Sequence, residues 1–472
     1  MNTAILKPPT VETRRAVLCA VVPLAIVAVL LGWPQPAVGD PQGYSFKAVA
    51  FLGDSPLGCG CTLVNDFEPG GIQNGGDVVF TADVASGGES VFLVQKGQIF
   101  QIAHSDVGEL GRIGFNQNGQ AVVGLLLNPS TLPIGVNGAV YRFSRQQGLT
   151  PVLTPNVTAA PGGGTFAGTF FNMGLNNSGV AVFPGLVTGA DILPGPPGVD
   201  GLGLGMGLFQ ADKHGTISSV VRPGDPAPGG HIFDWAANGW INDGGDIAFG
   251  AHVAFDPCVD FGNPQSSEIF CGESVYFKNA ATGVIQSIAH QGDPAPGGGH
   301  YGVAFGPVVN NSGDIVFIGD LSSPVGTPLD KYGVFLFSKG ATIAVARPGD
   351  SMPGGGNLLS AGVSDATYFI NDPGDVSFSA VLDSTNGSGV NDTSVYVYSK
   401  AKGSLRLVAR TGTPVLGSTI MNLGAPAAFF GGTPPAAPTA QFGGIINEQG
   451  QVLFSATLAD GRVALLVGTP TP

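Results

Sequence analysis

A short segment rich in glycine and proline carries several of the side chains in this sequence that could do chemistry. Residues 346–356 read ARPGDSMPGGG, and close copies stand at 221–231, VRPGDPAPGGH, and at 289–300, AHQGDPAPGGGH. Carboxylate and turn carbonyl oxygens are ligands that Ca²⁺ takes, and successive glycine N–H groups can hold an anion. The sequence therefore leaves three interpretations open: a structural turn, an anion site, or a calcium site at Asp225, Asp293 and Asp350.

A cationic or titratable side chain stands at one repeat position of these segments. Arg222, His290 and Arg347 lie three residues before the aspartate, and Arg410 takes the same position in a looser copy at 409–417, ARTGTPVLG, where Thr413 replaces the aspartate. Four such groups could form a broken ring of positive potential that attracts carboxylated or sulfated ligands, so they are predicted ligand-binding residues. The alternative is that each pairs with its own aspartate, as Arg222 could with Asp225.

Two tryptophans, Trp235 and Trp240, stand in one predicted strand and are added to the candidate ligand-binding residues. They could be core residues, or they could stack on a sugar near a channel. No Gly-x-Ser-x-Gly turn is present, and the glycine-rich segments lack the Lys-Ser/Thr pair of a nucleotide loop. The sequence predicts no catalytic residues, no metal ligands and, apart from the calcium alternative, no cofactor.

A recurring turn motif indicates what must position these residues. The pattern Asn-x-x-Gly-[Asp/Gln]-[Val/Ile]-x-Phe returns, in strict or looser form, at intervals of 43 to 76 residues. This interval is typical of a supersecondary repeat. Asparagine caps such a bend with its own side chain, and glycine supplies the positive φ. The seven copies begin at Gln73, Asn116, Asn176, Asn242, Asn310, Asn371 and Asn447.

Each unit reads as four short strands, most clearly at residues 231–242, 245–253, 273–278 and 284–290. Seven four-stranded antiparallel units predict an all-β fold, a seven-bladed β-propeller in one domain, 40–472. The segment YSFKAVAFLGD, 44–54, matches a fourth strand, whereas the last unit supplies only the inner ones. The N-terminal strand is therefore expected to close the last blade, with the glycine-rich segments as connectors between blades.

The tandem turn motifs and the GDPAPGGG connectors resemble bacterial exported proteins with tandem NxxGxxxAF-type repeats. The resemblance covers 44–468 and concerns the repeat. It implies a β-propeller-like fold and an exported protein, and it brings no activity with it.

An export signal is predicted at residues 1–39, because Arg14 and Arg15 precede the apolar run Ala16–Trp33 and a small-residue exit at 37–39. Both the general secretory and the twin-arginine routes remain open. The remaining chain holds 16 basic and 32 acidic residues, a formal charge of −16, which disfavours nucleic acid as a partner. No other stretch is long and apolar enough to span a membrane. We expect a monomer that is secreted or periplasmic.

An exported chain can oxidise its cysteines. Cys258 and Cys271 lie in one predicted loop and are the expected disulfide. Cys59 and Cys61 are separated by one residue, so a bond between them is expected to be strained. A metal site at this CGC sequence has no further Cys or His at ligand spacing.

Three segments between second and third strands are long, at 188–207, 255–272 and 320–333. In a propeller these loops share a face with the connectors, and long loops on a rigid scaffold often carry recognition. The predicted function is therefore a non-catalytic exported binding scaffold for a glycan or protein ligand. The alternatives are an extracellular polysaccharide hydrolase or lyase at the channel mouth, and a structural envelope component.

Overall fold

Short antiparallel strands make up nearly all the regular structure of the protein. The structure is a computed structural model, and it describes residues 43–107, 113–127, 138–169, 172–189, 204–254, 258–260, 269–271, 273–321, 332–362, 368–383, 392–423 and 443–471. All of these residues belong to one compact unit, Val38–Pro472. The predicted export signal, 1–39, lies outside the described residues. Within them no helix is long and apolar enough to cross a membrane.

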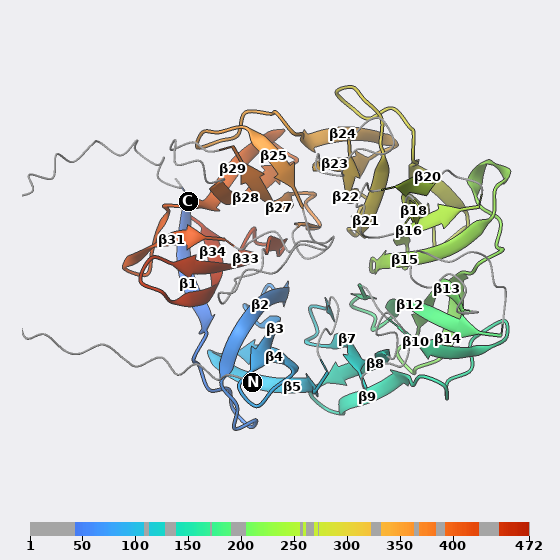
Figure 1. The fold of residues 1–472 in the computed structure, drawn as a ribbon, viewed down its shortest axis with the longest axis horizontal. Helices are drawn as coiled ribbons and strands as arrows, with labels where there is room; N and C mark the ends of the chain where they lie inside the picture. The colour runs from blue at the N-terminus through green and yellow to red at the C-terminus, as the bar shows by residue number, and fades with distance from the viewer. Residues whose placement is uncertain are drawn as a thin grey trace, which may run out of the picture. The chain divides into compact units, whose positions relative to one another are not determined.

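The strands form seven blades arranged as a ring (Figure 1), and the predicted seven-bladed β-propeller is confirmed. Blade 1 contains β2 (Leu63–Ile72), β3 (Val78–Val84), β4 (Glu89–Gln95) and β5 (Gln98–Ser105). Blade 2 contains β6 (Gly114–Phe115), β7 (Ala121–Leu126), β8 (Gly138–Ser144) and β9 (Gly148–Leu153). Blade 3 contains β10 (Thr165–Gly168), β11 (Gly174–Leu175), β12 (Ala181–Thr188), β13 (Leu204–Ala211) and β14 (Ile217–Val221).

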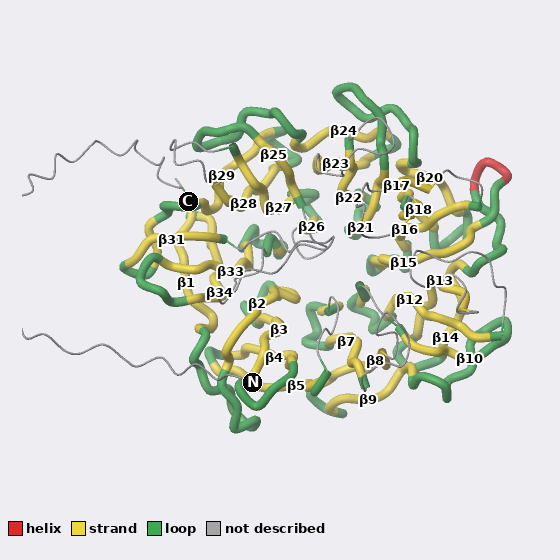
Figure 2. Tube along the Cα trace, viewed as in Figure 1, coloured by secondary structure: helices red, strands yellow, loops and turns green. Residues whose placement is uncertain are grey.

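Blade 4 contains β15 (Phe233–Ile241), β16 (Ile247–Val253), β19 (Ser274–Lys278) and β20 (Ile285–Ala289), with a separate hairpin of β17 (Cys258–Asp260) and β18 (Ile269–Cys271). Blade 5 contains β21 (Val303–Val309), β22 (Ile315–Asp320), β23 (Tyr332–Ser338) and β24 (Ala341–Ala346). Blade 6 contains β25 (Leu358–Ala361), β26 (Tyr368–Ile370), β27 (Val376–Leu382), β28 (Asp392–Ser399) and β29 (Ser404–Arg410). The one helical turn described is the 3-10 segment Pro228–Gly230, at the edge of the ring in Figure 2.

Blade 7 joins the two ends of the described chain. It contains β30 (Pro414–Val415), β31 (Ser418–Asn422), β32 (Ile445–Ile446), β33 (Val452–Leu458) and β34 (Val463–Pro470), and its outer strand is β1 (Tyr44–Phe51). β1 pairs antiparallel with β34 from Tyr44 opposite Pro470 to Phe51 opposite Ala464. Figure 1 shows this blue strand among the red ones. The predicted closure by the N-terminal strand is confirmed, and it leaves no unpaired outer edge on β34.

Aromatic pairs fill the blades at the last position of the turn motif. Phe249 and Phe317 are fully buried on second strands. Phe249 stacks on Tyr276 of the third strand with ring centroids 5.7 Å apart, and Phe317 stacks on Phe335 at the same distance. Offset aromatic contacts of this kind add to the burial of apolar area. The motif's phenylalanine is therefore a core residue.

The Asn-x-x-Gly turns have the predicted geometry. In the turn at Asn310 the side-chain Oδ1 accepts the N–H groups of Ser312 and Asp314, at 3.0 and 2.9 Å, and Gly313 has φ +76°. A residue with a Cβ is strained at that φ, so glycine is required. Asparagine thus caps its own bend, as the sequence indicated.

The same asparagines also join the blades, in a closed ring of side-chain amides. Each side-chain amide nitrogen donates to the backbone carbonyl oxygen of the first motif residue in the next blade, at 2.5 to 3.1 Å. The seven bonds run from Gln73 to Asn116, then to Asn176, Asn242, Asn310, Asn371 and Asn447, and from Asn447 back to Gln73. This ring, which we call the amide ring, connects first and last blades as it connects all the others.

A second ring runs beside it through the next residue of each turn. Here the backbone N–H donates to a side-chain oxygen of the following blade, at 2.7 to 3.0 Å. The seven residues are Asn74, Gln117, Asn177, Asp243, Asn311, Asp372 and Glu448. Burial raises the pKa of the Glu448 carboxyl, the N–H of Asp372 opposes this, and the charges of Asp372 and Asp243 raise it further.

Candidate binding face

The propeller has two faces that differ in what they carry. The hub face carries the two hydrogen-bonded rings and the turns between third and fourth strands. The loop face carries the connectors and the ends of second strands, which are bonded together: Ala254 N–H donates to Ile232 O at 2.9 Å, and Asp383 N–H donates to Asn357 O at 2.9 Å. The prediction that connectors and strand two-to-three loops share a face is confirmed for these blades. Most of each long loop, at 190–203, 255–257, 261–268 and 322–331, lies outside the described residues.

The connector aspartates close backbone turns. Asp225 Oδ2 accepts the N–H of Arg222 at 2.8 Å, and the carboxylates of Asp293 and Asp350 accept the equivalent N–H groups at 2.9 and 2.8 Å. An aspartate that bonds a nearby backbone N–H is a common way to fix a turn. Among the described residues, no group of three or more His, Cys, Asp or Glu side chains could hold a metal ion. Calcium at these aspartates stays a prediction.

The connector arginines use their guanidinium groups on backbone carbonyls. Arg222 donates to Pro161 O and to Gly163 O, the latter at 3.2 Å. Arg347 donates to Gly298 O at 2.6 Å, and Arg410 donates to Gly354 O at 2.5 Å. In each case the arginine at the end of a fourth strand holds the glycine-rich connector that enters the same blade. We call these contacts the arginine clasps.

The clasps concern two predictions: that these residues bind acidic ligands, and that each pairs with its own aspartate. The aspartate three residues on pairs with the backbone of Arg222 and Arg347, and their guanidiniums reach the clasp carbonyls instead. Arg410 adds an ion pair with Asp392 at 2.8 Å, where both side chains are buried. His290 has its Nδ1 3.0 Å from the carbonyl oxygen of Gln291. A role of the four residues in ligand binding stays a prediction.

The two tryptophans are buried in blade 4. Trp240 is 8% exposed, and its ring packs edge-on against Phe369 of β26, with centroids 5.1 Å apart. This contact joins the innermost strands of blades 4 and 6 across the centre of the ring. Trp235 is 3% exposed and lies 6.4 Å from the ring of His252, nearly parallel to it. Stacking on a sugar would need an accessible ring face, and both rings are buried here. Ligand binding by either tryptophan stays a prediction.

A histidine and aspartate pair, which the sequence analysis did not single out, lies beside Trp235. His252 Nδ1 is 2.7 Å from Asp234 Oδ2, and the two side chains are 2% and 7% exposed. Within the described part of the chain, His252 Nε2 and Trp235 Nε1 are buried without a hydrogen-bond partner. The hairpin register about the Asn242 turn, which sets Trp235 opposite His252, is the signal that could have found this pair.

A polar network, also missed from the sequence, crosses from blade 3 to blade 5. Asn172 Nδ2 donates to Asn238 Oδ1 at 3.1 Å, and Asn238 Nδ2 donates to Glu273 at 3.1 and 3.2 Å. Gly306 N–H reaches Glu273 Oε1 at 3.4 Å. A Cβ on Gly250 would stand 1.4 Å from that same oxygen, so only glycine leaves room for the carboxylate. The network ties three inner strands together near the loop face.

A serine, histidine and aspartate set in blade 1 has the composition of a catalytic triad. His104 Nδ1 lies 2.8 Å from Ser90 Oγ, and its Nε2 lies 2.9 Å from Asp106 Oδ1. Ser90 is fully buried and also accepts Gln101 Nε2 at 2.9 Å, while the Asp106 side chain is 92% exposed. A nucleophile must be reached by its substrate, and the orienting carboxylate of a triad is normally the buried member. The set is therefore a strand-end contact.

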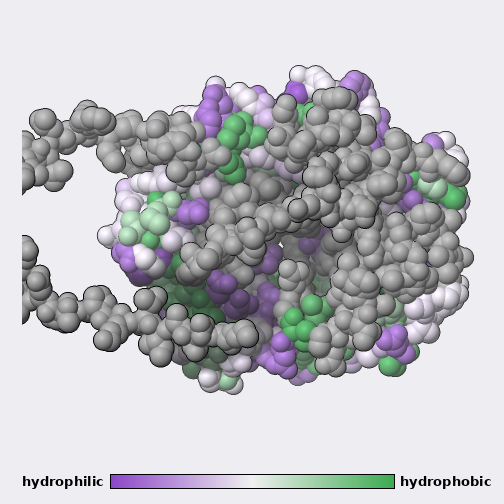
Figure 3. Space-filling view, viewed as in Figure 1, coloured by the Kyte–Doolittle hydropathy of each residue, from purple (hydrophilic) through white to green (hydrophobic). Residues whose placement is uncertain are grey.

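Exposed apolar side chains are distributed unevenly between the faces. Of ten large apolar residues that are exposed in the described chain, seven lie in connectors, at the starts of first strands, or just past the ends of second and fourth strands, all on the loop face. They are Val64, Val107, Leu127, Val157, Leu359, Leu416 and Met421. Val284 follows a turn of the hub face, Ile343 lies on an outer strand, and Leu57 lies against the outer strand β5, where its N–H donates to Ile99 O. Figure 3 shows apolar groups as separate patches among hydrophilic ones.

A disulfide other than the expected one is present among the described side chains. Cys59 and Cys61 are bonded, with Cα atoms 5.1 Å apart, and the strain expected of this bond stays a prediction. That Cα separation is within the ordinary range for a disulfide. Cys258 and Cys271 face each other in the register of β17 and β18, as a cross-strand disulfide requires. Their bond remains a prediction.

The fold and its two faces define a closed seven-bladed β-propeller. Residues 53–273, slightly less than half of the chain, match a family described as "Family of unknown function (DUF7453)". A search of curated proteins found no match. Similar solved structures include an oligogalacturonate lyase in complex with manganese, 12% identical, covering 91% of this chain and 98% of that chain with a TM-score of 0.46.

Two further solved structures are similar to this chain. A polysaccharide lyase of family PL25, an ulvan lyase, is 12% identical and covers 89% of this chain and 95% of that chain, with a TM-score of 0.43. The β-propeller domain of the Trilobed protease from Pyrococcus furiosus is 8% identical and covers 86% of this chain and 97% of that chain, with a TM-score of 0.44.

Proposed function

We propose that the protein is an exported, non-catalytic binding scaffold, monomeric, that recognises a glycan or protein ligand through its loop face. The observation that carries the proposal is the uneven distribution of exposed apolar side chains, seven of ten on that face among the described residues. Apolar groups that remain exposed on a soluble domain often mark an interaction site when they gather on one surface. Methyl-rich side chains can contact apolar protein groups and the C–H faces of sugars.

The repeated polar residues support this assignment because they are used for architecture. The amide ring and the second ring occupy the polar groups of the hub face. The arginine clasps occupy guanidinium groups at the connectors. Recognition is then left to side chains that differ from blade to blade, and these lie on the loop face.

The test is a binding screen of the chain from residue 40 onward against glycan and peptide arrays, followed by three variants of matched exposure. Val157→Ser and Met421→Ser alter the loop face at side chains 75% and 59% exposed, and Val284→Ser alters a hub-face side chain 62% exposed. We expect at least one loop-face variant to bind at least tenfold more weakly, and the control to bind normally. Equal loss in the control, or full binding by both loop-face variants, would contradict the proposal.

The predicted cationic ring is tested in the same assay. We expect Arg222→Ala with Arg347→Ala to lower the melting temperature, because two clasps are lost, and to leave binding of acidic glycans at low salt unchanged. A selective loss of acidic ligands with an unchanged melting temperature would assign the ligand to these arginines instead.

The enzyme alternative, a polysaccharide hydrolase or lyase, has one observation in its favour. A histidine whose Nδ1 is held by a carboxylate and whose Nε2 has no partner among the described residues is the arrangement of a general base. Against it, the imidazole is 2% exposed. Cleavage of an extracellular polysaccharide by the purified chain, lost in His252→Asn at an unchanged melting temperature, would establish this alternative.

A further inference from the structure

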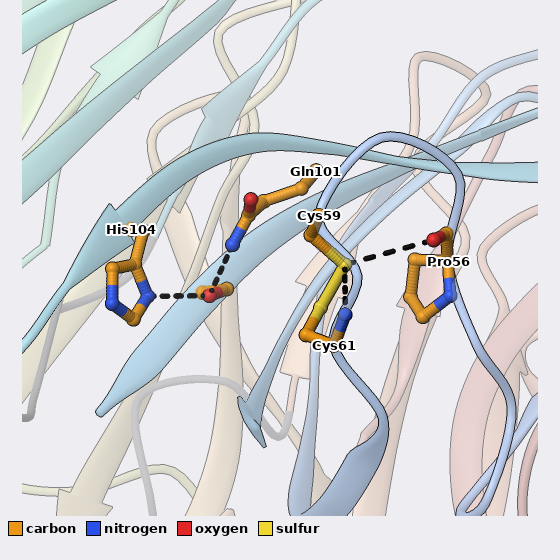
Figure 4. Close-up of a disulfide and its surroundings, with 6 residues drawn as sticks. Pro56, Cys59, Cys61, Gln101 and His104 are labelled. Carbon is orange, nitrogen blue, oxygen red and sulfur yellow. Dashed lines mark hydrogen bonds between the residues drawn. A yellow bond between two sulfur atoms is a disulfide. The ribbon is translucent and has the colours of Figure 1, made fainter. Parts of the chain in front are cut away.

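The Cys59–Cys61 disulfide lies in the connector that enters blade 1 (Figure 4) and closes a loop over a single residue, Gly60. In the chain-entropy model a disulfide stabilises a fold by restricting the unfolded chain, and the effect grows with the length of the closed loop. A bond between residues two positions apart closes the shortest kind of loop, so it restricts the unfolded chain least. A stabilising role does not account for this disulfide.

The connector keeps its shape through other bonds. Gly53 N–H donates to Leu63 O at 2.8 Å, and Leu63 N–H donates to Asp54 O at 3.0 Å. Leu57 N–H donates to Ile99 O of β5 at 2.8 Å, which fixes the loop against the neighbouring strand. These three bonds hold the backbone on both sides of the cysteines. Breaking the sulfur–sulfur bond therefore leaves the backbone of the connector in place.

The two sulfurs have unequal surroundings. Cys61 is 6% exposed and belongs to the apolar core of blade 1 with Leu63 and Phe67, whereas Cys59 lies at the margin of that core and is more exposed. The backbone N–H of Cys61 points at Cys59 Sγ, 3.2 Å away. A hydrogen bond of this kind stabilises a thiolate, and burial in apolar surroundings disfavours one. Cys59 is thus the accessible sulfur and the better thiolate once the bond is reduced.

We propose that Cys59 and Cys61 form a redox-active site that oxidises a peptide or protein dithiol by thiol–disulfide exchange. One thiolate of the dithiol attacks Cys59 Sγ, the Cys59–Cys61 bond breaks, and Cys61 Sγ leaves with the electron pair and takes a proton. The second sulfur of the dithiol, as a thiolate, then attacks the first sulfur of the dithiol, which is bonded to Cys59 in the mixed disulfide. The dithiol closes its own disulfide, and Cys59 is released as a thiolate. Two electrons pass from the dithiol to the protein, the dithiol becomes a disulfide, and both cysteines end reduced.

The surroundings of the site suit a peptide. Leu57, in the same connector, is 50% exposed and provides an apolar contact next to the disulfide. Gln101 and His104 lie on the strand beside the loop in Figure 4, and both are hydrogen-bonded to Ser90. The contacts that Figure 4 draws to Cys59 Sγ are the Cys61 N–H, at 3.2 Å, and the Pro56 carbonyl oxygen, at 3.6 Å, and of these the N–H stabilises a thiolate.

The first experiment measures reduction in a chain carrying Cys258→Ser and Cys271→Ser, so that one cysteine pair remains after export. We expect glutathione buffers to reduce Cys59–Cys61 reversibly, and the reduced protein to melt within about 3 °C of the oxidised one. Resistance to glutathione at every ratio tested, or unfolding on reduction, would show that the bond is a structural staple and overturn the proposal.

The second experiment separates the two sulfurs and the substrate. In the same background, Cys61→Ser leaves Cys59 as the only thiol, and Cys59→Ser leaves Cys61. Glutathione disulfide is expected to modify the first variant at least tenfold faster than the second. The oxidised protein should convert one equivalent of a Cys-x-x-Cys peptide to its disulfide, detected by mass spectrometry. Equal rates for the two variants, or no peptide oxidation, would contradict the assignment.

Discussion

Substitution of the amide-ring asparagines measures how firmly the blades are joined. Asn310 is 4% exposed, its Oδ1 accepts two N–H groups of its own turn, and its Nδ2 donates to Asn371 O at 2.9 Å. A net contribution of about 1 kcal/mol for each bond gives a loss of about 3 kcal/mol for Asn310→Ala. Asn310→Asp retains the two turn bonds but places a buried carboxylate oxygen against the Asn371 carbonyl and the Asp314 carboxylate. We expect it to cost at least about 3 kcal/mol, from the lost bond, the orphaned acceptor and the like-charge contact.

The assay is urea unfolding of the chain from residue 40, followed by the fluorescence of Trp235 and Trp240. Ser312→Ala, an exposed change in the same turn, is the control and is expected to stay within about 0.5 kcal/mol of the parent. The sharpest comparison is between Asn116→Asp, at an ordinary joint, and Asn447→Asp, which breaks the joint between the last and first blades; in both turns the side-chain amide also donates to a neighbouring glutamine. If the ring is continuous, Asn447→Asp loses as much as Asn116→Asp. A loss several-fold smaller at Asn447 would refute closure at that joint.

Four other outcomes are expected. Deletion of Tyr44–Gly53 removes the outer strand of the last blade and should lower the melting temperature by more than about 5 °C, which calorimetry checks; an unchanged value would argue against its role in closure. Arg347→Ala should cost about 1 to 2 kcal/mol through its lost clasp, whereas a neutral result would make the clasp incidental. Glu448→Gln should stabilise the protein at pH 7, because burial raises the folded pKa of this carboxyl and the folded protein becomes less stable as the pH rises and the carboxyl ionises. The gain in stability should vanish below the ordinary pKa of glutamate. Free-thiol labelling should find Cys258 and Cys271 unreactive in protein made in an oxidising compartment, where their 12-residue loop would contribute about 3 kcal/mol.

The propeller could be predicted because the sequence repeats its turn chemistry. Asn310 and Gly313 predict the turn from their own side-chain and backbone preferences, and Phe317 predicts the buried strand that follows. Residues 44–54 match a fourth strand, and the last unit lacks one. This match predicted that the N-terminal strand closes the last blade. Both inferences compare short sequence patterns at different places along the chain.

What could not be predicted involves backbone partners and distant neighbours. The Nδ2 of Asn447 bonds a carbonyl 374 residues away, which only the closed ring brings near. Arg222 carries no sign that its guanidinium prefers connector carbonyls to Asp225, because carbonyl groups are common to all residues. The Cys59–Cys61 bond was judged from sequence separation alone, and the turn at Gly60, with φ +63°, makes it possible.

The amide ring also sets an order of events during folding. Its other joints span 43 to 76 residues, so neighbouring blades can dock soon after each is formed. The joint from Asn447 to Gln73 spans 374 residues. Closing a loop about six times longer than a typical joint costs about 1.6 kcal/mol more in chain entropy. We therefore expect the joint between the two ends to form last, closing an open arc of docked blades.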